Sequence, residues 1–112
     1  MALSAKHREV LNALRTHGDT LTHPREIVHW AYFPTIDLRA HFVEQGLEAG
    51  FKLDGTSEPN DESPEFRARL AHIDIPNEDV IERITNWLSS LAQRCGGEYD
   101  GWETQVIWSP SP

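Results

Sequence analysis

The chain has 112 residues, 38% of them hydrophobic and 25% charged, and this composition predicts one soluble globular domain. Ten basic and eighteen acidic residues give a net charge of −8, which argues against direct nucleic-acid binding and favours a basic partner or simple solubility. No apolar run approaches the about 20 residues of a membrane-spanning helix, and the N-terminus lacks the apolar core of a signal peptide. The single cysteine, Cys95, fits a reducing compartment, so we expect a cytoplasmic protein.

The N-terminal third predicts a helix and then a strand. Apolar residues recur at helical spacing over residues 3–17, with Ser4 as the candidate N-cap. A loop over residues 19–25 leads to the strand Ile27–Phe33, which Pro34 ends. Both sides of this strand are largely apolar, so we expect it in the middle of a sheet.

The middle of the chain predicts a second helix, a short strand and a loop. Thr35 is the candidate N-cap and Gly50 the end of the helix. The strand is expected over Phe51–Asp54 and the loop over residues 55–64. The residues of this helix expected to face the core are Ile36, Ala40, Val43 and Leu47, with Phe42 beside them.

The last part predicts strand, helix and strand. Phe66–Ile75 alternates imperfectly, because its apolar side switches near Leu70 and Ala71, and a β-bulge there would explain the switch. Asn77 is the candidate N-cap of the next helix, and a strand-like run follows Gly97 and ends at Trp108. The apolar stripe of that helix consists of Val80, Ile84, Trp87, Leu88, Leu91 and Cys95.

This element order predicts an α+β fold of ferredoxin-like type. It is a βαββαβ sandwich with a four-stranded antiparallel sheet, both helices on one face, and an extra N-terminal helix. We expect the N-terminal helix to cover the other face of the sheet, or else a second copy of the chain to do so. The expected divisions are residues 1–23 for the helix and loop, 24–108 for the ferredoxin-like domain, and 109–112 for a flexible tail.

Two stretches are candidates for partner binding. Residues 54–65 hold five acids and no base, among them Asp61, Glu62 and Glu65. The second stretch runs from Tyr99 through Asp100 and Gly101 to Trp102. It is either a recognition surface, since aromatic residues beside polar ones mark interfaces, or a folding corner in which Gly101 permits a bulge. Strict alternation places Asp100 and Trp102 on one side of that strand and Tyr99 and Gly101 on the other.

The six histidines do not predict a metal site. His17, His23 and His29 are six residues apart, a spacing that fits no helical or zinc-finger ligand set, so we expect no metal and no cofactor. His29 lies among apolar neighbours and must find a hydrogen-bonding partner. It is either a satisfied structural histidine or a residue of a pocket, which Tyr32, Tyr99 and Trp102 could also line.

Three motifs resemble the family of regulator of ribonuclease E activity B. They are His29-Trp30-Ala31-Tyr32-Phe33-Pro34, Glu48-Ala49-Gly50-Phe51, and the stretch from Gly96 to Glu103, which is the most specific. The resemblance spans roughly residues 24–108 and implies a ferredoxin-like fold. It also implies a non-catalytic bacterial cytoplasmic protein that binds a ribonuclease and restrains RNA decay by protein contact.

The resemblance and the charges together give a docking hypothesis. The acidic loop and a rim formed by Glu98, Asp100 and Glu103 are expected to bind a basic, RNA-binding segment of a ribonuclease and compete with RNA. The competing hypotheses are a small-ligand module or enzyme, and a structural interaction domain. The sequence leaves monomer and homodimer open.

Overall fold

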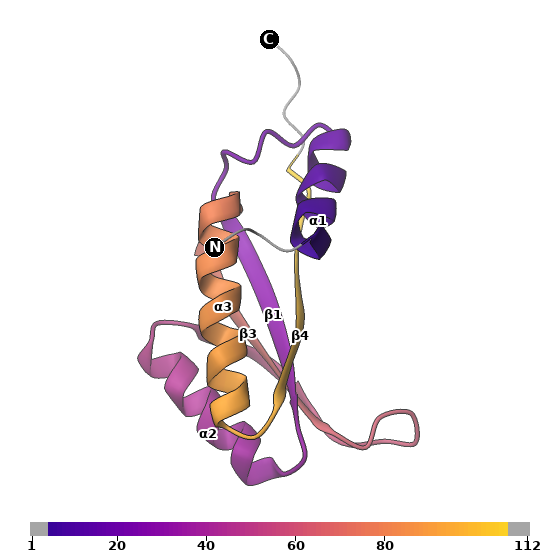
Figure 1. Ribbon diagram of the computed structural model, residues 1–112, viewed down its shortest axis with the longest axis vertical. Helices are drawn as coiled ribbons and strands as arrows, with labels where there is room; N and C mark the ends of the chain where they lie inside the picture. The colour runs from indigo at the N-terminus through magenta and orange to yellow at the C-terminus, as the bar shows by residue number, and fades with distance from the viewer. Residues whose placement is uncertain (1–4, 108–112) are drawn as a thin grey trace.

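The computed structural model describes residues 5–107, which form a single four-stranded sheet with three helices (Figure 1). The seven elements, in chain order, are α1 (Ala5–Thr16), β1 (Arg25–Phe33), α2 (Ile36–Glu48), β2 (Lys52–Ser57), β3 (Phe66–Asp74), α3 (Glu78–Arg94) and β4 (Glu98–Thr104). The predicted strand ending at Trp108 stops at Thr104, and Trp108 itself lies outside the described residues, as do Ser4 and the tail.

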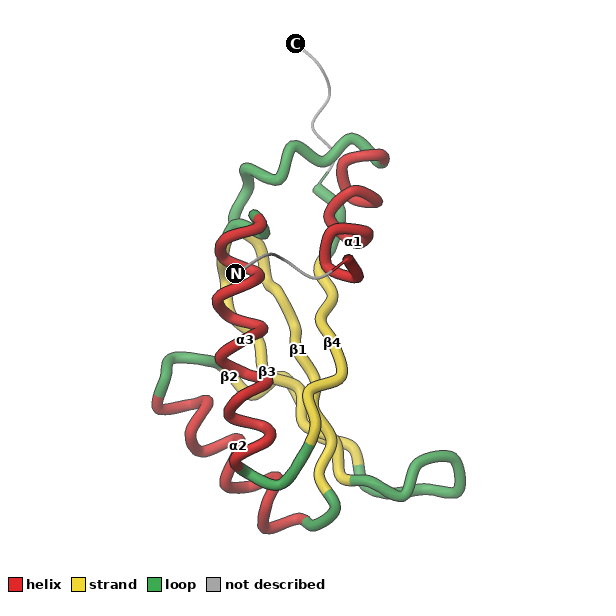
Figure 2. Tube along the Cα trace, in the orientation of Figure 1, coloured by secondary structure: helices red, strands yellow, loops and turns green. Residues whose placement is uncertain are grey.

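The sheet has the strand order β2-β3-β1-β4, and all three pairings are antiparallel. Strand β1 is central, as predicted, and its residues on one face, from Arg25 to Phe33, are all buried. Helices α2 and α3 cover that face, so the ferredoxin-like α+β fold is confirmed (Figure 2). The division of the chain at residues 23 and 108 stays a prediction.

The local signals at the helix ends act as expected. The side chains of Thr35 and Asn77 accept hydrogen bonds from the backbone N–H of Leu38 and Val80, the third residue of each following helix. Gly50 and Gly96 follow α2 and α3 with φ of 102° and 77°, a left-handed conformation that strains residues with a Cβ.

Helix α1 packs on the same face of the sheet as α2 and α3, so the expectation that it covers the opposite face is wrong. Leu11 and Leu14 of α1 are buried in a cluster with Ile81 of α3 and Trp102 of β4. This position lets α1 fill the space beside α3 at the end of the sheet that α2 does not reach (Figure 1). The opposite face carries no helix within residues 5–107.

The sheet corrects two further expectations. Strand β3 pairs with β1 without any register shift, so the bulge predicted at Leu70 and Ala71 is absent. The irregularity lies in β2, where Asp54 is the extra residue between Leu53 and Gly55, and β2 continues to Ser57 through part of the predicted loop. The imperfect alternation has another cause: the apolar residues Ala71 and Ile73 follow Arg67 and Arg69 on the face that no described helix covers, and Ile73 is exposed there.

Candidate functional site

A β-bulge in β4 organises the candidate site. Trp30 of β1 lies opposite Gly101 and Ala31 lies opposite Tyr99, which leaves Asp100 without a residue opposite it. The extra residue shifts the alternation by one, so Tyr99 and Trp102 point to the same side, toward the helices. Strict alternation separated these two residues and was therefore wrong, while the expected irregularity beside Gly101 is confirmed.

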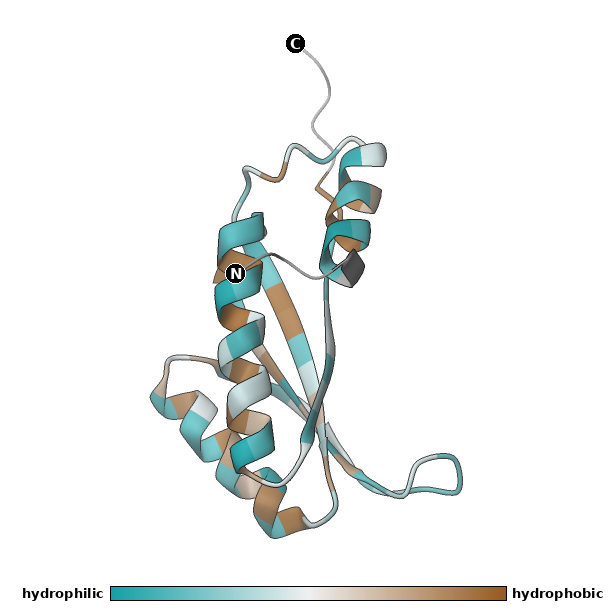
Figure 3. Ribbon diagram, in the orientation of Figure 1, coloured by the Kyte–Doolittle hydropathy of each residue, from teal (hydrophilic) through white to brown (hydrophobic). Residues whose placement is uncertain are grey.

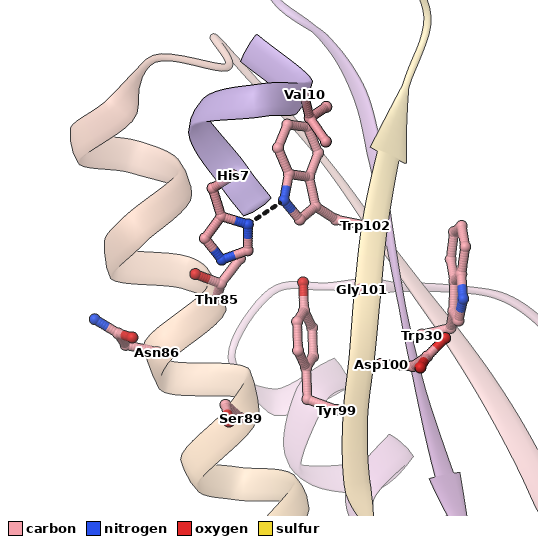
Figure 4. A pocket seen from close by; sticks show the side chains of 10 residues that line it. All are labelled: His7, Val10, Trp30, Thr85, Asn86, Ser89, Tyr99, Asp100, Gly101 and Trp102. Carbon is pink, nitrogen blue, oxygen red and sulfur yellow. Dashed lines mark hydrogen bonds between the residues drawn. The ribbon is translucent and has the colours of Figure 1, made fainter. Parts of the chain in front are cut away.

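The inner side of β4 borders a cleft of about 440 Å³ between α1, α3 and β4 (Figure 4). Trp102 is only 8% exposed, and its indole N–H donates a hydrogen bond to Nδ1 of His7 over 2.8 Å. Tyr99, which precedes Trp102 in β4, points into the same cleft. Thr85, Asn86 and Ser89 of α3 add polar side chains to the lining, and Trp30, Asp100 and Gly101 also border the cleft.

Behind Tyr99, a chain of polar side chains runs across β4, β1 and β3 on the face that the helices cover. The Tyr99 hydroxyl lies 2.8 Å from Nδ1 of His29, and Nε2 of His29 lies 2.9 Å from Nε2 of His72. Nδ1 of His72 is 3.9 Å from a carboxylate oxygen of Asp74. His29 is 2% exposed, so it is the satisfied, interior histidine of the two alternatives, and it does not reach the surface where a partner could bind.

The Asp74 carboxylate, 3.9 Å away, favours the tautomer of His72 with its proton on Nδ1. In that tautomer Nε2 of His72 accepts from His29, and Nδ1 of His29 accepts from the Tyr99 O–H. Burial, helped by the charges of His72 and His7, lowers the pKa of His29 from 6.5 to about 3. Burial, together with the charge of Asp100, raises the pKa of Tyr99 above its ordinary value. At neutral pH the chain therefore carries no charge on His29 or Tyr99.

We expect acid to destabilise the fold through His29. An unfolded histidine binds its proton near pH 6.5, whereas folded His29 stays neutral down to about pH 3. The contribution of neutral His29 to the free energy of unfolding is therefore complete above pH 6.5. It is lost as the pH falls, by about 2 kcal/mol at pH 5. Burial also lowers the pKa of His72, which adds to the loss in the same direction. Urea unfolding at pH 7.5 and pH 5 measures the difference.

A variant and a titration isolate this contribution. His29→Gln should weaken the pH dependence of the free energy of unfolding, while His41→Gln, at an exposed position, should leave it unchanged. An NMR titration of His29 in the folded protein with a midpoint near pH 6.5 would contradict the assignment.

The outer side of β4 faces away from the helices and carries acids beside two aromatic residues of β1. In each row of paired residues across the sheet, a β4 residue lies next to a residue of the central strand β1. Glu98 lies beside Tyr32, and Glu103 lies beside Val28. The bulged Asp100 lies on this side beside Trp30, opposite to Tyr99 (Figure 4). The other neighbour in these rows is β3, which contributes Arg67 and Arg69. We call this uncovered surface the open face.

The candidate acids of the β2–β3 loop are divided between two places. Asp61 and Glu62 are exposed at the end of a loop that projects from the body of the molecule (Figure 2). Glu65, by contrast, lines one hollow with Tyr32 and Glu98. The loop and the rim of β4 therefore meet at Glu65 and not at the loop tip.

The protein family follows from comparison with known proteins. A family model described as "Regulator of ribonuclease activity B" (RraB) matches residues 4–104. The chain belongs to the RraB family. A search of curated proteins found no match.

The RraB family description indicates a regulator of ribonuclease activity, and the match covers α1 as well as the ferredoxin-like part. Within residues 5–107, no three His, Cys, Asp or Glu side chains gather in a way that could hold a metal ion. No helix in the same range is long and apolar enough to cross a membrane.

Sequence reasoning missed three residues of this RraB chain. His7 was seen only as part of a helix, and it reaches Trp102 because α1 packs beside β4. Trp30 was part of a motif but was not assigned to a site, although its place on the opposite side of β1 from His29 was predictable from alternation. His72 was not considered, because only the pairing of β1 with β3 brings it to His29.

Proposed function

We propose that this chain regulates a ribonuclease without catalysis, by binding a basic, RNA-binding segment of that enzyme on the open face. The observation that carries the proposal is the acidic row of the bulged β4, formed by Glu98, Asp100 and Glu103, beside Trp30 and Tyr32. The family description supports the ribonuclease as the partner. The proposal places both proteins in the bacterial cytoplasm.

The chemistry of the open face favours arginine in the partner segment. A guanidinium group can stack on the faces of Trp30 and Tyr32 and at the same time form paired hydrogen bonds with a carboxylate of β4. Glu98 and Glu103 are exposed, so their carboxylates are accessible to such a group. A segment held in this way cannot bind RNA at the same time, which gives inhibition by competition.

Direct RNA binding is the weaker explanation of an open sheet face with aromatic residues. The two bases on β3 already have partners: Nε of Arg69 lies 3.2 Å from a carboxylate oxygen of Asp54, and Arg67 donates to the hydroxyl of Ser57 over 2.8 Å. The acids of β4 repel phosphate at the same surface, and the whole chain carries a charge of −8.

The proposal predicts that charge position, and not only net charge, decides binding. A Glu98→Lys, Glu103→Lys double variant should bind a fluorescent arginine-rich peptide about tenfold more weakly than the wild type, because two close charge pairs are lost and reversed. Fluorescence anisotropy at low and moderate salt measures the affinity. The wild-type affinity should fall as salt rises.

The loop tip supplies a matched control. Asp61→Lys, Glu62→Lys changes the net charge by the same +4, from −8 to −4, but away from Trp30. It should weaken binding by less than about threefold, the effect of long-range charge alone. Equal losses in the two double variants would overturn the open face as the docking site. Tighter binding to an RNA oligonucleotide than to the peptide would overturn the choice of partner.

A further inference from the structure

Helix α2 carries an apolar stripe that the described chain does not bury. Of the residues expected to face the core, Ile36, Ala40 and Leu47 are exposed instead, while Val43 is partly buried against the core as expected. The buried line of α2 is instead on the Phe42 and Gly46 side. Ile36 is 50% exposed and Leu47 is 47% exposed, and hydrophobic segments recur along α2 in Figure 3.

The stripe continues onto the edge of the sheet. An open groove of about 550 Å³ runs between α2 and β2, with Leu53 and Thr56 of β2 on its second side. Strand β2 is an outer strand of the sheet, so one of its edges has no neighbouring strand within residues 5–107. An apolar helix side and an unpaired strand edge therefore lie next to each other, and each is a surface that folded proteins usually cover.

We propose that two copies of this chain associate here, with their β2 strands paired antiparallel about a two-fold axis at Leu53 and their α2 stripes packed across it. A strand edge beside an apolar helix is matched in both respects by the same patch on a second copy, which is how a two-fold interface works. This inference does not rest on the proposed ribonuclease binding.

The charges of β2 favour this register. In an antiparallel pair centred on Leu53, Lys52 lies opposite Asp54 of the partner copy, and Asp54 lies opposite Lys52 of the partner copy. Lys52 is exposed, and Asp54 lies beside Arg69 of the open face, so both face away from α2. The two Leu53 side chains meet on the helix side, next to the α2 stripes. The row of Lys52 and Asp54 and the row of the two Leu53 residues, which are the rows inside β2 in both copies, are therefore matched in polarity.

The association has a geometric consequence for the open face. A two-fold axis between antiparallel edge strands is perpendicular to the sheet, so the two sheets become one sheet of eight strands. Both open faces then lie on the same side, and the β4 strands form the two outer edges. The dimer presents two acidic rows to one partner surface, and no residue of the open face needs to be covered.

A cysteine on the axis tests the register. The Leu53→Cys variant should form a covalent dimer under mild oxidation, since directly opposite residues of an antiparallel pair have Cα atoms about 5 Å apart, within disulfide reach. Thr56→Cys is the matched control on the same strand: its two copies lie about 20 Å apart along the pair and should not cross-link. Cys95 is buried, so the native thiol does not contribute.

Sedimentation equilibrium gives the second readout. The unmodified chain should dimerise reversibly, and Leu47→Lys, at a position exposed in the single chain, should raise the dimer dissociation constant about tenfold or more while its circular dichroism stays unchanged. Equal cross-linking of Leu53→Cys and Thr56→Cys would overturn the register. A wild-type chain that stays monomeric at every concentration would overturn the dimer. The dimer is overturned in the same way if the groove of a monomeric chain instead binds an amphipathic helix of another protein.

Discussion

An Arg25→Met variant is expected to lose about 3–5 kcal/mol of the free energy of unfolding, because it leaves a buried carboxylate without its cation. Arg25 is 6% exposed and Asp19 is 3% exposed. Both terminal nitrogens of Arg25 donate to the Asp19 carboxylate, one of them over 3.0 Å, and Arg25 also donates to the Gln105 carbonyl over 3.0 Å. The pair ties the loop before β1 to the chain after β4.

The backbone near Asp19 depends on the same carboxylate. It accepts hydrogen bonds from the N–H of Leu21 over 2.9 Å and of Ile107 over 3.0 Å, and Leu21 has a φ of 58°, which is costly for a leucine. Burial alone would raise the pKa of Asp19, but the hydrogen bonds from Arg25, Ile107 and Leu21 outweigh it and lower the pKa from 3.8 to about 2. This stabilisation is present above pH 3.8 and is lost as the pH falls through about 2.

Urea unfolding at pH 7 measures the loss. Arg15→Met is the control. Arg15 is exposed on α1, and the side-chain hydrogen bond that the structure gives it goes to Asn12 of the same helix. This control should change the free energy of unfolding by less than about 0.5 kcal/mol. Similar midpoints for the two variants would show that the pair is not an anchor of the fold.

A Gly97→Ala variant is expected to lose about 3 kcal/mol, because the added methyl group has no space. A Cβ at this position would lie against the carbonyl oxygen of Tyr32 and the ring of Phe33, closer than van der Waals contact allows. Phe33 is fully buried and the carbonyl belongs to the central strand, so neither can move away cheaply. Thermal unfolding followed by circular dichroism would show the loss as a lower Tm.

Gly50→Ala separates this crowding from backbone conformation. Gly50 has a φ of 102°, but a Cβ there would meet no atom within 4 Å. Its substitution should cost about 1 kcal/mol, from strain alone. If Gly50→Ala destabilised the protein as much as Gly97→Ala, the close approach of β4 to the end of β1 would not be the reason for a glycine at position 97.

The fold was predictable because its signals are local and agree with one another. Thr35 and Asn77 cap their helices, Gly50 and Gly96 end them, and the two-sided apolar pattern of Ile27–Phe33 places β1 in the middle of the sheet. These signals depend on a few neighbouring residues and on the periods of helix and strand.

The candidate site was only partly predictable, because it depends on register and on which face a helix covers. One extra residue at Asp100 brings Tyr99 and Trp102 to the same side, and alternation alone cannot place such a bulge. The partners of His29 come from strands 43 and 70 residues away in the chain. The apolar pattern also could not identify which side of α2 faces the core, since both sides of that helix carry apolar residues.

The open face as a docking surface for a basic segment is tested most directly by NMR chemical-shift mapping. An arginine-rich peptide is titrated into the ¹⁵N-labelled chain. We expect the largest shifts at the indole N–H of Trp30 and at the amides of Glu98–Thr104, with smaller shifts at Asp61 and Glu62. Shifts confined to the loop tip, to α2 or to the cleft beside His7, or no saturable shift at low salt, would contradict it.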